Sequence, residues 1–279
     1  MATEVTLSAA ARSTLLSLAN TADLISRSNE RLSSGLKVAS PIDDAKVFFE
    51  AKALNDRAST LSDKKDGIDQ GISSLSAALE AVDSIDSLVR QAKGIALAAK
   101  TATGTELTSL VTQYNGLLTQ IDNLASDASY QGLNLVNGTG STLSVSFSEQ
   151  TSSLLSVASV DLTTGSLGLN ISSAAVTTTG TSFANSSNID ASITELDAAV
   201  TTLRGNGQTL GSNVALLQTR LDFTKNYVNV LEGGAGKLTL ADITEEGANL
   251  VALQTRQQLG INALSFAGQS EQNILALFR

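Results

Sequence analysis

The chain has 279 residues and a formal net charge of −9 at pH 7, and this acidic balance argues against binding to a nucleic-acid backbone. It contains no cysteine and no histidine, which excludes disulfide bonds and thiolate metal sites and removes the commonest general base. Apolar residues make up 42% of the chain but aromatic residues only 4%, so aliphatic side chains must build the core, as in helix–helix seams.

The first helical pattern spans residues 15–36. Its positions recur at alternating steps of three and four, which is the spacing of a heptad seam with one polar interruption. They are Leu15, Leu18, Ala22, Ile25, Asn29, Leu32 and Leu36. This spacing predicts an amphipathic helix that packs along a partner.

A joint between two helices is expected within residues 30–45, which read ERLSSGLKVASPIDDA. Gly35 can end the first helix. Ser40 can cap the next one, with Pro41 at its first helical position. Asp43 and Asp44 would then place negative charge in the first turn.

A second, longer heptad pattern runs over residues 47–89. As one helix it would be about 65 Å long at 1.5 Å per residue, which requires partner helices along its length. Thr103 and Glu106 have the spacing of a capping box at the start of a third helix. The short connection predicts that the third helix folds back antiparallel on the second.

The amino-acid composition changes after residue 129, where Ser, Thr, Gly and Asn become frequent. Asn137-Gly138 reads as a turn, and Leu143, Val145 and Phe147 alternate with serine as in a half-buried strand. We expect short strands and loops here, with one or two hairpins.

Helical periodicity returns over residues 193–231, followed by glycines at Gly233, Gly234 and Gly236 that we interpret as a second joint. A last helix is expected to begin near residues 240–242. Its apolar residues are distributed nearly all the way around the helix axis. They include Leu250, Leu253, Leu259, Leu264, Phe266, Ile274, Leu277 and Phe278. A helix that is apolar on every side must be buried on every side, so this pattern predicts assembly with other chains.

These elements predict a mostly α fold, in which paired N- and C-terminal regions form a long antiparallel helical bundle or coiled coil around a small β-hairpin or loop insert. Residues 1–40 and 237–279 would form a terminal coiled-coil domain. Residues 41–138 and 189–236 would form a long-helix bundle domain, and 139–188 a small variable surface insert. No apolar stretch is long enough for membrane insertion, and the N-terminus lacks the pattern of a cleavable signal peptide.

No pattern of catalytic residues is found. Asp43 and Asp44 are adjacent, as are Glu245 and Glu246, so each pair faces in different directions on a helix. The glycines at 233–236 lack the Lys-Ser/Thr of a phosphate-binding loop. We therefore expect no enzyme, no cofactor and no metal site.

Several segments closely resemble bacterial flagellins. They are ERLSSGLKVASPIDDA at 30–45, QGISSLSAALEAVDSI at 70–85, SYQGLNLVNG at 129–138, and ADITEEGANLVALQTRQQLGINALSFAGQSEQNILALFR at 241–279. The resemblance covers more than half of the chain in the right order, and the middle, about 139–188, carries no such signal.

The resemblance implies a structural subunit that self-assembles as a homopolymer into the bacterial flagellar filament for swimming motility. It also implies type III export of an unfolded chain to the outside of the cell, and an export chaperone, a filament cap and hook-junction proteins as partners. The terminal apolar residues would then pack between helices in the filament core. The alternatives are a hook–filament junction protein and, from periodicity alone, a soluble coiled-coil scaffold.

In many flagellins an innate receptor of the toll-like class contacts a run reading R-V-R-E-L and a Glu on the third helix. The corresponding positions here are Leu88, Val89, Arg90, Gln91 and Ala92, with Gln113 on the third helix. Because a bidentate Arg and a charged Glu are missing, the resemblance implies a flagellin that this receptor senses weakly.

Overall fold

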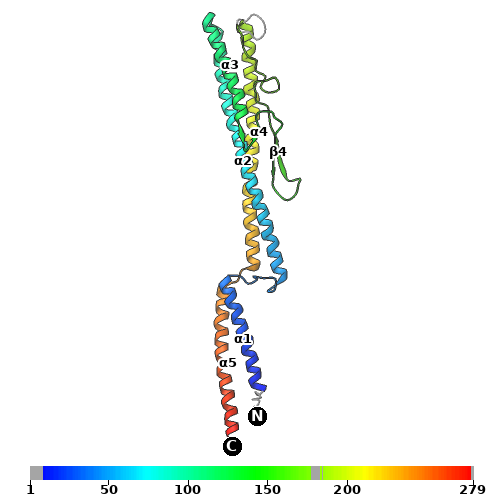
Figure 1. Cartoon of the computed structure of the whole chain (residues 1–279), viewed down its shortest axis with the longest axis vertical. Helices are drawn as coiled ribbons and strands as arrows, with labels where there is room; N and C mark the ends of the chain where they lie inside the picture. Colours follow the sequence, from blue (N-terminus) through cyan, green and yellow to red (C-terminus); the bar gives the residue numbers. More distant parts are fainter. Residues whose placement is uncertain (1–8, 177–182, 184, 278–279) are drawn as a thin grey trace. The chain divides into compact units, whose positions relative to one another are not determined.

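The computed structural model describes residues 9–176, 183 and 185–277, with side chains placed for all of these except Ala10 and residues 271–277. Its helices are α1 (Ala9–Ser34), α2 (Ala45–Ala99), α3 (Gly104–Asp127), α4 (Ser186–Thr239) and α5 (Ile243–Leu277) (Figure 1). Its strands are β1 (Ser129–Tyr130), β2 (Leu133–Asn134), β3 (Thr142–Ser146) and β4 (Leu154–Ala158). The prediction of a mostly helical fold with a small β insert is confirmed.

The chain falls into two compact units. The first comprises Met1–Arg57 with Val230–Arg279, and the second comprises Ala58–Asn229. The divisions lie inside α2 and α4, whereas the sequence suggested boundaries at the joints and a separate insert at 139–188. Residues of that insert, including Leu143, Val145 and Leu162, instead belong to the core of the second unit.

In the first unit, α1 ends at Ser34, and Gly35 adopts a φ of +71°, a conformation that glycine accepts without strain. The chain then pairs with the last residue of α4 and with the segment that follows it. Lys37 N–H donates to the Thr239 carbonyl at 2.7 Å, and Ala241 N–H donates to the Gly35 carbonyl at 3.0 Å. The two links between helices therefore brace each other through backbone hydrogen bonds.

The predicted start of the second helix is wrong in detail. Ser40, Pro41 and Asp43 belong to a turn, and α2 begins only at Ala45. The capping side chain is Asp44, whose Oδ1 accepts from Val47 N–H at 3.1 Å. The Asp43 carboxylate accepts from Ser40 N–H at 3.0 Å and stabilises the turn. Ser40 lies too far before Ala45 to cap the helix.

The second predicted joint is also wrong. Gly233, Gly234 and Gly236 lie inside α4, which continues to Thr239, and the chain leaves the helix only at residues 240–242. Gly234 lies against Leu54 of α2, where a Cβ atom would be 3.6 Å from the Leu54 Cδ1 atom. Helical hydrogen bonding and packing against α2 outweigh the weak helix propensity of these glycines.

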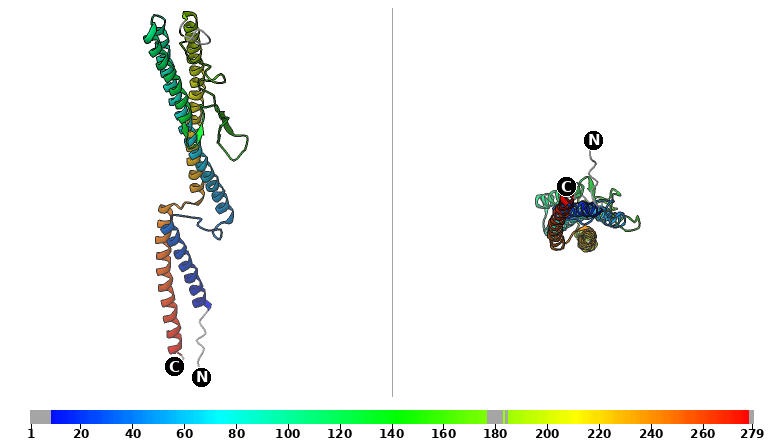
Figure 2. Two further views of the ribbon diagram at one scale, coloured as in Figure 1. Left: turned by 45° about the horizontal axis from the view of Figure 1, so that its top comes forward. Right: turned by 90° about the horizontal axis from the view of Figure 1, so that it is seen from below.

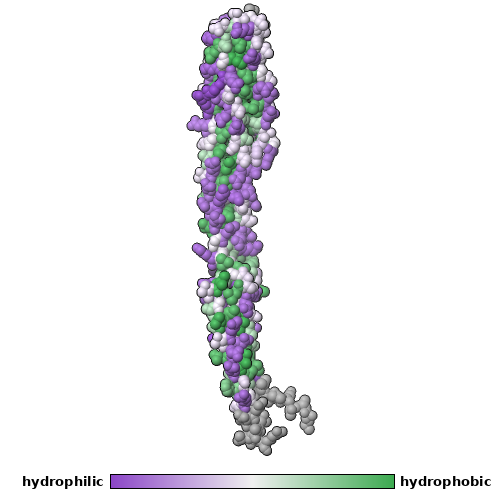
Figure 3. All heavy atoms as spheres, turned by 90° about the vertical axis from the view of Figure 1, so that its left-hand side faces the viewer, coloured by the Kyte–Doolittle hydropathy of each residue, from purple (hydrophilic) through white to green (hydrophobic). Residues whose placement is uncertain are grey.

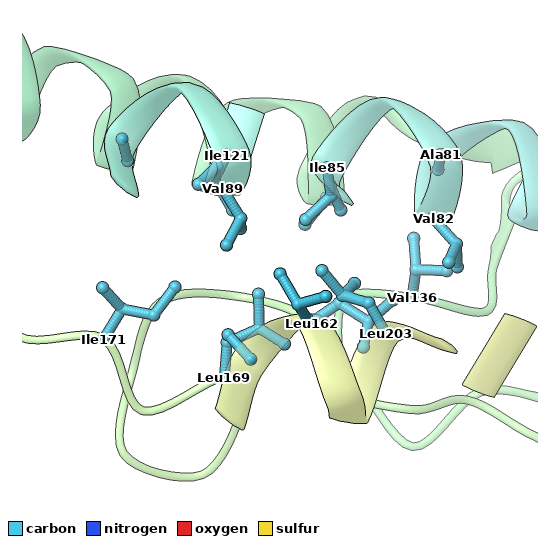
Figure 4. Packing of buried hydrophobic residues seen from close by; sticks show 14 of the residues in the cluster. Ala81, Val82, Ile85, Val89, Ile121, Val136, Leu162, Leu169, Ile171 and Leu203 are labelled. Carbon is cyan, nitrogen blue, oxygen red and sulfur yellow. The ribbon is translucent and has the colours of Figure 1, made fainter. Parts of the chain in front are cut away.

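In the second unit, α2, α3 and α4 surround one hydrophobic core, and α3 lies beside α2 (Figures 1 and 2). Side chains of α2, including Val82, Ile85 and Val89, point towards Leu162 and Leu203 (Figure 4). Lys93 of α2 pairs with Asp197 of α4, whereas Gly71 of α2 lies against Leu217 of α4, so the two helices run antiparallel. Much of the irregular segment between α3 and α4 is thus part of the core.

The start of α3 differs from the predicted capping box. Thr103 has the extended backbone of an N-cap residue, but its side chain makes no capping hydrogen bond. Gly104, the first residue of the helix, has a φ of +60°. The sharp reversal after α2 therefore determines the backbone here.

Two antiparallel strand pairs follow α3. Strands β1 and β2 are joined by Gln131 and Gly132, both with positive φ, as in a tight hairpin turn. Strands β3 and β4 pair with Leu143 opposite Val157 and Val145 opposite Leu155. The predicted alternation in β3 is confirmed, since Leu143 and Val145 are buried and face the core.

Candidate functional site

Helices α1 and α5 pack side by side in both views of the chain (Figures 1 and 2). The buried side chains of α1 along this contact are small: Ala11, Thr21 and Ser28. Leu18 lies so close to Gly260 that a Cβ atom there would be 3.0 Å from the leucine Cδ2 atom. The small side chains and Gly260 therefore let the two helices approach closely, while larger apolar side chains such as Leu18 pack beside them.

The predicted seam of α1 is partly displaced. Leu18, Ile25, Leu32 and Leu36 are half-buried, whereas Leu15 is 41% exposed. The contact runs instead through Thr21 and Ser28, one residue before the predicted Ala22 and Asn29. Hydroxyl side chains take these places because α5 approaches closely and because Thr21 Oγ1 can donate back to the Ser17 carbonyl at 2.8 Å.

Helix α5 presents apolar side chains to solvent. Leu250, Leu253 and Leu264 are half-buried, but Leu259 is 64% exposed and Phe266 is 72% exposed. Ile274 and Leu277 lie in α5 with side chains outside the described part, and Phe278 lies outside the described residues. Val251 and Ile261 of α5 and Leu16 and Leu24 of α1 add to the exposed apolar surface. One partner helix thus leaves much of α5 uncovered.

A polar cluster fixes the register of α1 against α5. Glu246 is only 9% exposed and accepts hydrogen bonds from Arg31 Nη1 at 2.8 Å and Ser28 Oγ at 3.0 Å. The hydrogen bond from Arg31, assisted by Ser28 and by the charges of Arg31 and Lys37, lowers the pKa of Glu246 against the opposing effect of burial. The carboxylate therefore favours one register of the two helices.

The turn before α2 carries a second ordered carboxylate. Asp43 accepts from Ser40 N–H, Ser40 Oγ and Ala39 N–H, and these hydrogen bonds lower its pKa. The turn displays Ile42, the most exposed large apolar residue in the part of the chain that the structure describes. A rigid turn with an uncovered isoleucine suits contact with another chain.

The positions compared with receptor contacts differ in how exposed they are. Ala92 is fully buried and Leu88 packs against the core of the second unit. Arg90 donates to Asp86 through Nε at 2.6 Å, which raises the pKa of Arg90. Gln91 and Gln113 line a groove between α2 and α3. Because Ala92 is covered, it cannot contact a partner, and the comparison at this position was wrong.

Within the described ranges, no group of three or more His, Cys, Asp or Glu side chains has the arrangement of a metal site. Among the same residues, no helix combines the length and the apolar character needed to cross a membrane.

The paired terminal helices and their uncovered apolar faces define a structural subunit that is made for contact with other protein chains. The model of the bacterial flagellin N-terminal helical region matches residues 5–141, and that of the C-terminal helical region matches residues 184–278. The chain belongs to the bacterial flagellin family.

Curated proteins of similar sequence align with nearly the whole chain. Flagellin FljN of Caulobacter vibrioides is 34% identical over 252 residues, covering 90% of this chain and 89% of that protein. Flagellin FljO of the same organism is 32% identical over 267 residues, covering 95% and 94%. The prediction from the resemblance, a flagellar filament subunit, is confirmed.

The fold is also that of a putative flagellar hook-associated protein from Vibrio parahaemolyticus, with a TM-score of 0.57 over 71% of this chain and all of that one. Its sequence identity is 14%, so this likeness concerns the fold alone.

Proposed function

We propose that this flagellin polymerises through α1 and α5, whose pair forms the core of the flagellar filament. The supporting observation is the uncovered apolar surface of α5, with Leu259 and Phe266 largely exposed. An apolar helix face of this extent is unfavourable in water and becomes favourable when neighbouring subunits cover it. Burial of one such side chain contributes roughly 1.5–3 kcal/mol.

Replacement of Phe266 by serine tests this proposal. Because Phe266 is largely exposed in the single chain, Phe266→Ser should leave the helical circular dichroism of the monomer unchanged. The concentration needed for polymerisation should rise by about 10- to 100-fold, the factor that corresponds to the lost burial. Gln258→Ser, at another exposed position of α5, is the matched control. Normal polymerisation of Phe266→Ser would contradict the role of this face.

The location and partners of the chain belong to the same proposal. Family membership supports secretion by type III export into an extracellular filament. An export chaperone, a filament cap and hook-junction proteins would then bind this subunit, and motility would follow from the filament. Immunogold labelling of intact cells tests the location, since label confined to the cell interior would contradict it.

A hook–filament junction role is less well supported. The hook-associated structure shares the fold at 14% identity, whereas relatives at 32% and 34% identity are named flagellins. Labelling along the whole filament supports the subunit role, and labelling only at its base would support the junction role.

We also propose weak sensing by the innate receptor. Leu88 offers no charged donor, and Gln113 keeps hydrogen bonding without charge assistance. Restoring Leu88→Arg and Gln113→Glu should raise the response of reporter cells to purified monomer, with Gln91→Glu as a single-site comparison. Ala92 should be left unchanged because it is buried in the core. A strong response to the unmodified chain would contradict this proposal.

A further inference from the structure

The dipeptide Asn-Gly occurs in the chain as Asn115-Gly116, Asn137-Gly138 and Asn206-Gly207. Glycine has no side chain to keep its backbone nitrogen away from the preceding asparagine. After losing its proton to hydroxide, this nitrogen can attack the asparagine Cγ atom, and Nδ2 leaves as ammonia by taking a proton from water. Water then opens the resulting five-membered imide to aspartate or isoaspartate, so the net reaction consumes water and releases ammonia.

Access to water does not distinguish the three sites. Hydrophilic residues are spread along the face seen in Figure 3, and Gly116 and Gly138 are both exposed. The reaction also requires the glycine N–H to leave its hydrogen bond and to turn towards the asparagine side chain. The cost of this local opening therefore decides which site reacts.

Helices hold two of the sites. Asn115-Gly116 lies inside α3 and Asn206-Gly207 inside α4, where each N–H is bonded to the carbonyl four residues earlier. Release of such an N–H in the middle of a helix requires local unfolding of that helix. The Asn115 side chain is also held, since Nδ2 donates to the Ala174 carbonyl at 2.7 Å and Oδ1 accepts from Ala174 N–H at 2.8 Å. Both helical sites should therefore react slowly in the folded protein.

The third site, Asn137-Gly138, lies outside the helices in the loop between β2 and β3. One backbone hydrogen bond holds the attacking nitrogen, from Gly138 N–H to the Val160 carbonyl at 3.0 Å. The next residues, Thr139 and Gly140, are exposed. Opening of this turn breaks few contacts, so it costs much less free energy than opening the middle of a helix.

The Asn137 side chain is folded forward over Gly138. Its Oδ1 atom accepts from Thr139 N–H at 3.2 Å and from Thr139 Oγ1 at 2.8 Å, as in an Asx turn. This arrangement places Cγ on the same side as the nitrogen that attacks it. The two donors also stabilise the negative charge that develops on Oδ1 when the new carbon–nitrogen bond forms.

Asp161 lies directly opposite Asn137, and the two residues form an antiparallel bridge. The backbone hydrogen bonds run between their neighbours, and one of them joins Leu162 N–H to the Val136 carbonyl at 2.9 Å. Residues opposed in this way form a non-hydrogen-bonded pair, whose side chains lie close together. A carboxylate at position 137 would thus repel that of Asp161, next to the fully buried Val136 and Leu162 (Figure 4).

We infer that Asn137 is a site of spontaneous deamidation in the folded protein, while the helices protect Asn115 and Asn206. The product carries an additional negative charge opposite Asp161, and isoaspartate also lengthens the backbone by a methylene group. Both changes weaken the bridge beside the core. The modification is thus a gradual and irreversible loosening of the second unit, and it does not depend on the proposed filament function.

Peptide mapping by mass spectrometry tests the site. The intact chain is kept at mildly alkaline pH, either folded or unfolded in urea, and deamidation is followed at each Asn-Gly. In urea the three sites should react at similar rates, which is the control for intrinsic reactivity. In the folded protein Asn137 should react at least about tenfold faster than Asn115 or Asn206. Equal rates in the folded protein, a faster reaction at a helical site, or no reaction at Asn137 would overturn the inference.

Substitution tests the effect of the product. Asn137→Asp keeps an acceptor for Thr139 and adds the charge, and it should lower the melting temperature by about 2–4 °C. Addition of Asp161→Asn removes the opposing charge and should restore most of this loss, with Asp161→Asn alone as the matched control. An unchanged melting temperature for Asn137→Asp, or a loss of the same size in the presence of Asp161→Asn, would overturn the inference.

Discussion

Single side chains determine the register of the terminal helices, and Glu246 is the clearest case. It lies in the first turn of α5, where a carboxylate is favoured by the helix dipole. Arg31 and Ser28 of α1 reach it from the other helix. Sequence reasoning treated Glu245 and Glu246 alike, and only the position of α1 separates their roles.

The lowered pKa of Glu246 predicts a dependence of filament stability on pH. Its contribution is fully present above the unfolded value of about 4.5 and is lost as the pH falls through the lower folded value. Glu246→Gln should therefore destabilise filaments at pH 7 by about 1–3 kcal/mol. The difference from the unmodified protein should shrink below pH 4.5.

Thermal melting of filaments between pH 7 and pH 3 measures this effect. Glu245→Gln is the matched control, because Glu245 lies in the same turn but is exposed. A difference between Glu246→Gln and the unmodified protein that stayed constant down to pH 3 would exclude the Arg31 pairing as its cause.

At the scale of the helices, glycine positions show how tertiary packing competes with intrinsic helix propensity. In α2, a Cβ atom at Gly71 would be 2.6 Å from the Cγ2 atom of Val145 in β3. A Cβ atom at Gly67, four residues earlier, would meet nothing within 4 Å. The close approach of the strand pair β3–β4 thus explains why residue 71 is glycine, but it does not explain the glycine at position 67.

We predict opposite effects for alanine at these two positions. Gly71→Ala should destabilise the second unit by about 1–3 kcal/mol, because the stiff side chain of Val145 must shift. Gly67→Ala should stabilise the protein by up to about 1 kcal/mol through helix propensity. Chemical denaturation of the full chain followed by circular dichroism measures both, and stabilisation by Gly71→Ala would contradict the close contact.

The end of α5 offers a further prediction for a whole element. Deletion of residues 274–279 should abolish polymerisation while the core of the second unit stays folded, because that core lies in residues 68–221. Sedimentation of the variant with filament seeds measures assembly, and cooperative melting of the monomer is the control for folding. Filaments from the shortened chain would contradict a role for this segment in assembly.

For the molecule as a whole, the two compact units differ in how completely their apolar side chains are buried. The second unit has a continuous core from Ile68 to Leu221, whereas the first relies on small seam residues and leaves apolar faces of α5 exposed. Ordering a residue costs about 1–2 kcal/mol, so helices with little burial are stable only with additional partners. Assembly supplies those partners.

Limited proteolysis should therefore distinguish monomer from filament. In monomer we expect cleavage within α1 and α5, leaving a resistant fragment that contains residues 68–221. In filaments the same sites should be protected. Mass spectrometry of the fragments identifies the cleavage points, and equal protection of α5 in both forms would contradict the inference that neighbouring subunits stabilise this helix.

The sequence by itself determined the helical character of the chain, the long spans that became α2 and α4, and the alternation in β3. These are local properties, since heptad and two-residue periodicities reveal which faces are apolar. Gly35 was identified as the end of a helix from another local property, the ability of glycine to end a helix. The resemblance to flagellins added the function, which periodicity alone could not separate from a scaffold protein.

The tertiary structure decided the features that depend on residues far apart in the chain. Thr21 and Ser28 form the seam of α1 because α5 approaches closely there, and α4 continues through Gly233–236 because α2 supports it. Asp44 caps α2 because the turn held by Asp43 delays the start of the helix to Ala45. Glu246 differs from Glu245 because Arg31 of α1 reaches it on α5. The apolar groove between α2 and α3 forms only because α3 folds back on α2. Such contacts depend on the spatial approach of distant segments, which local spacing does not encode.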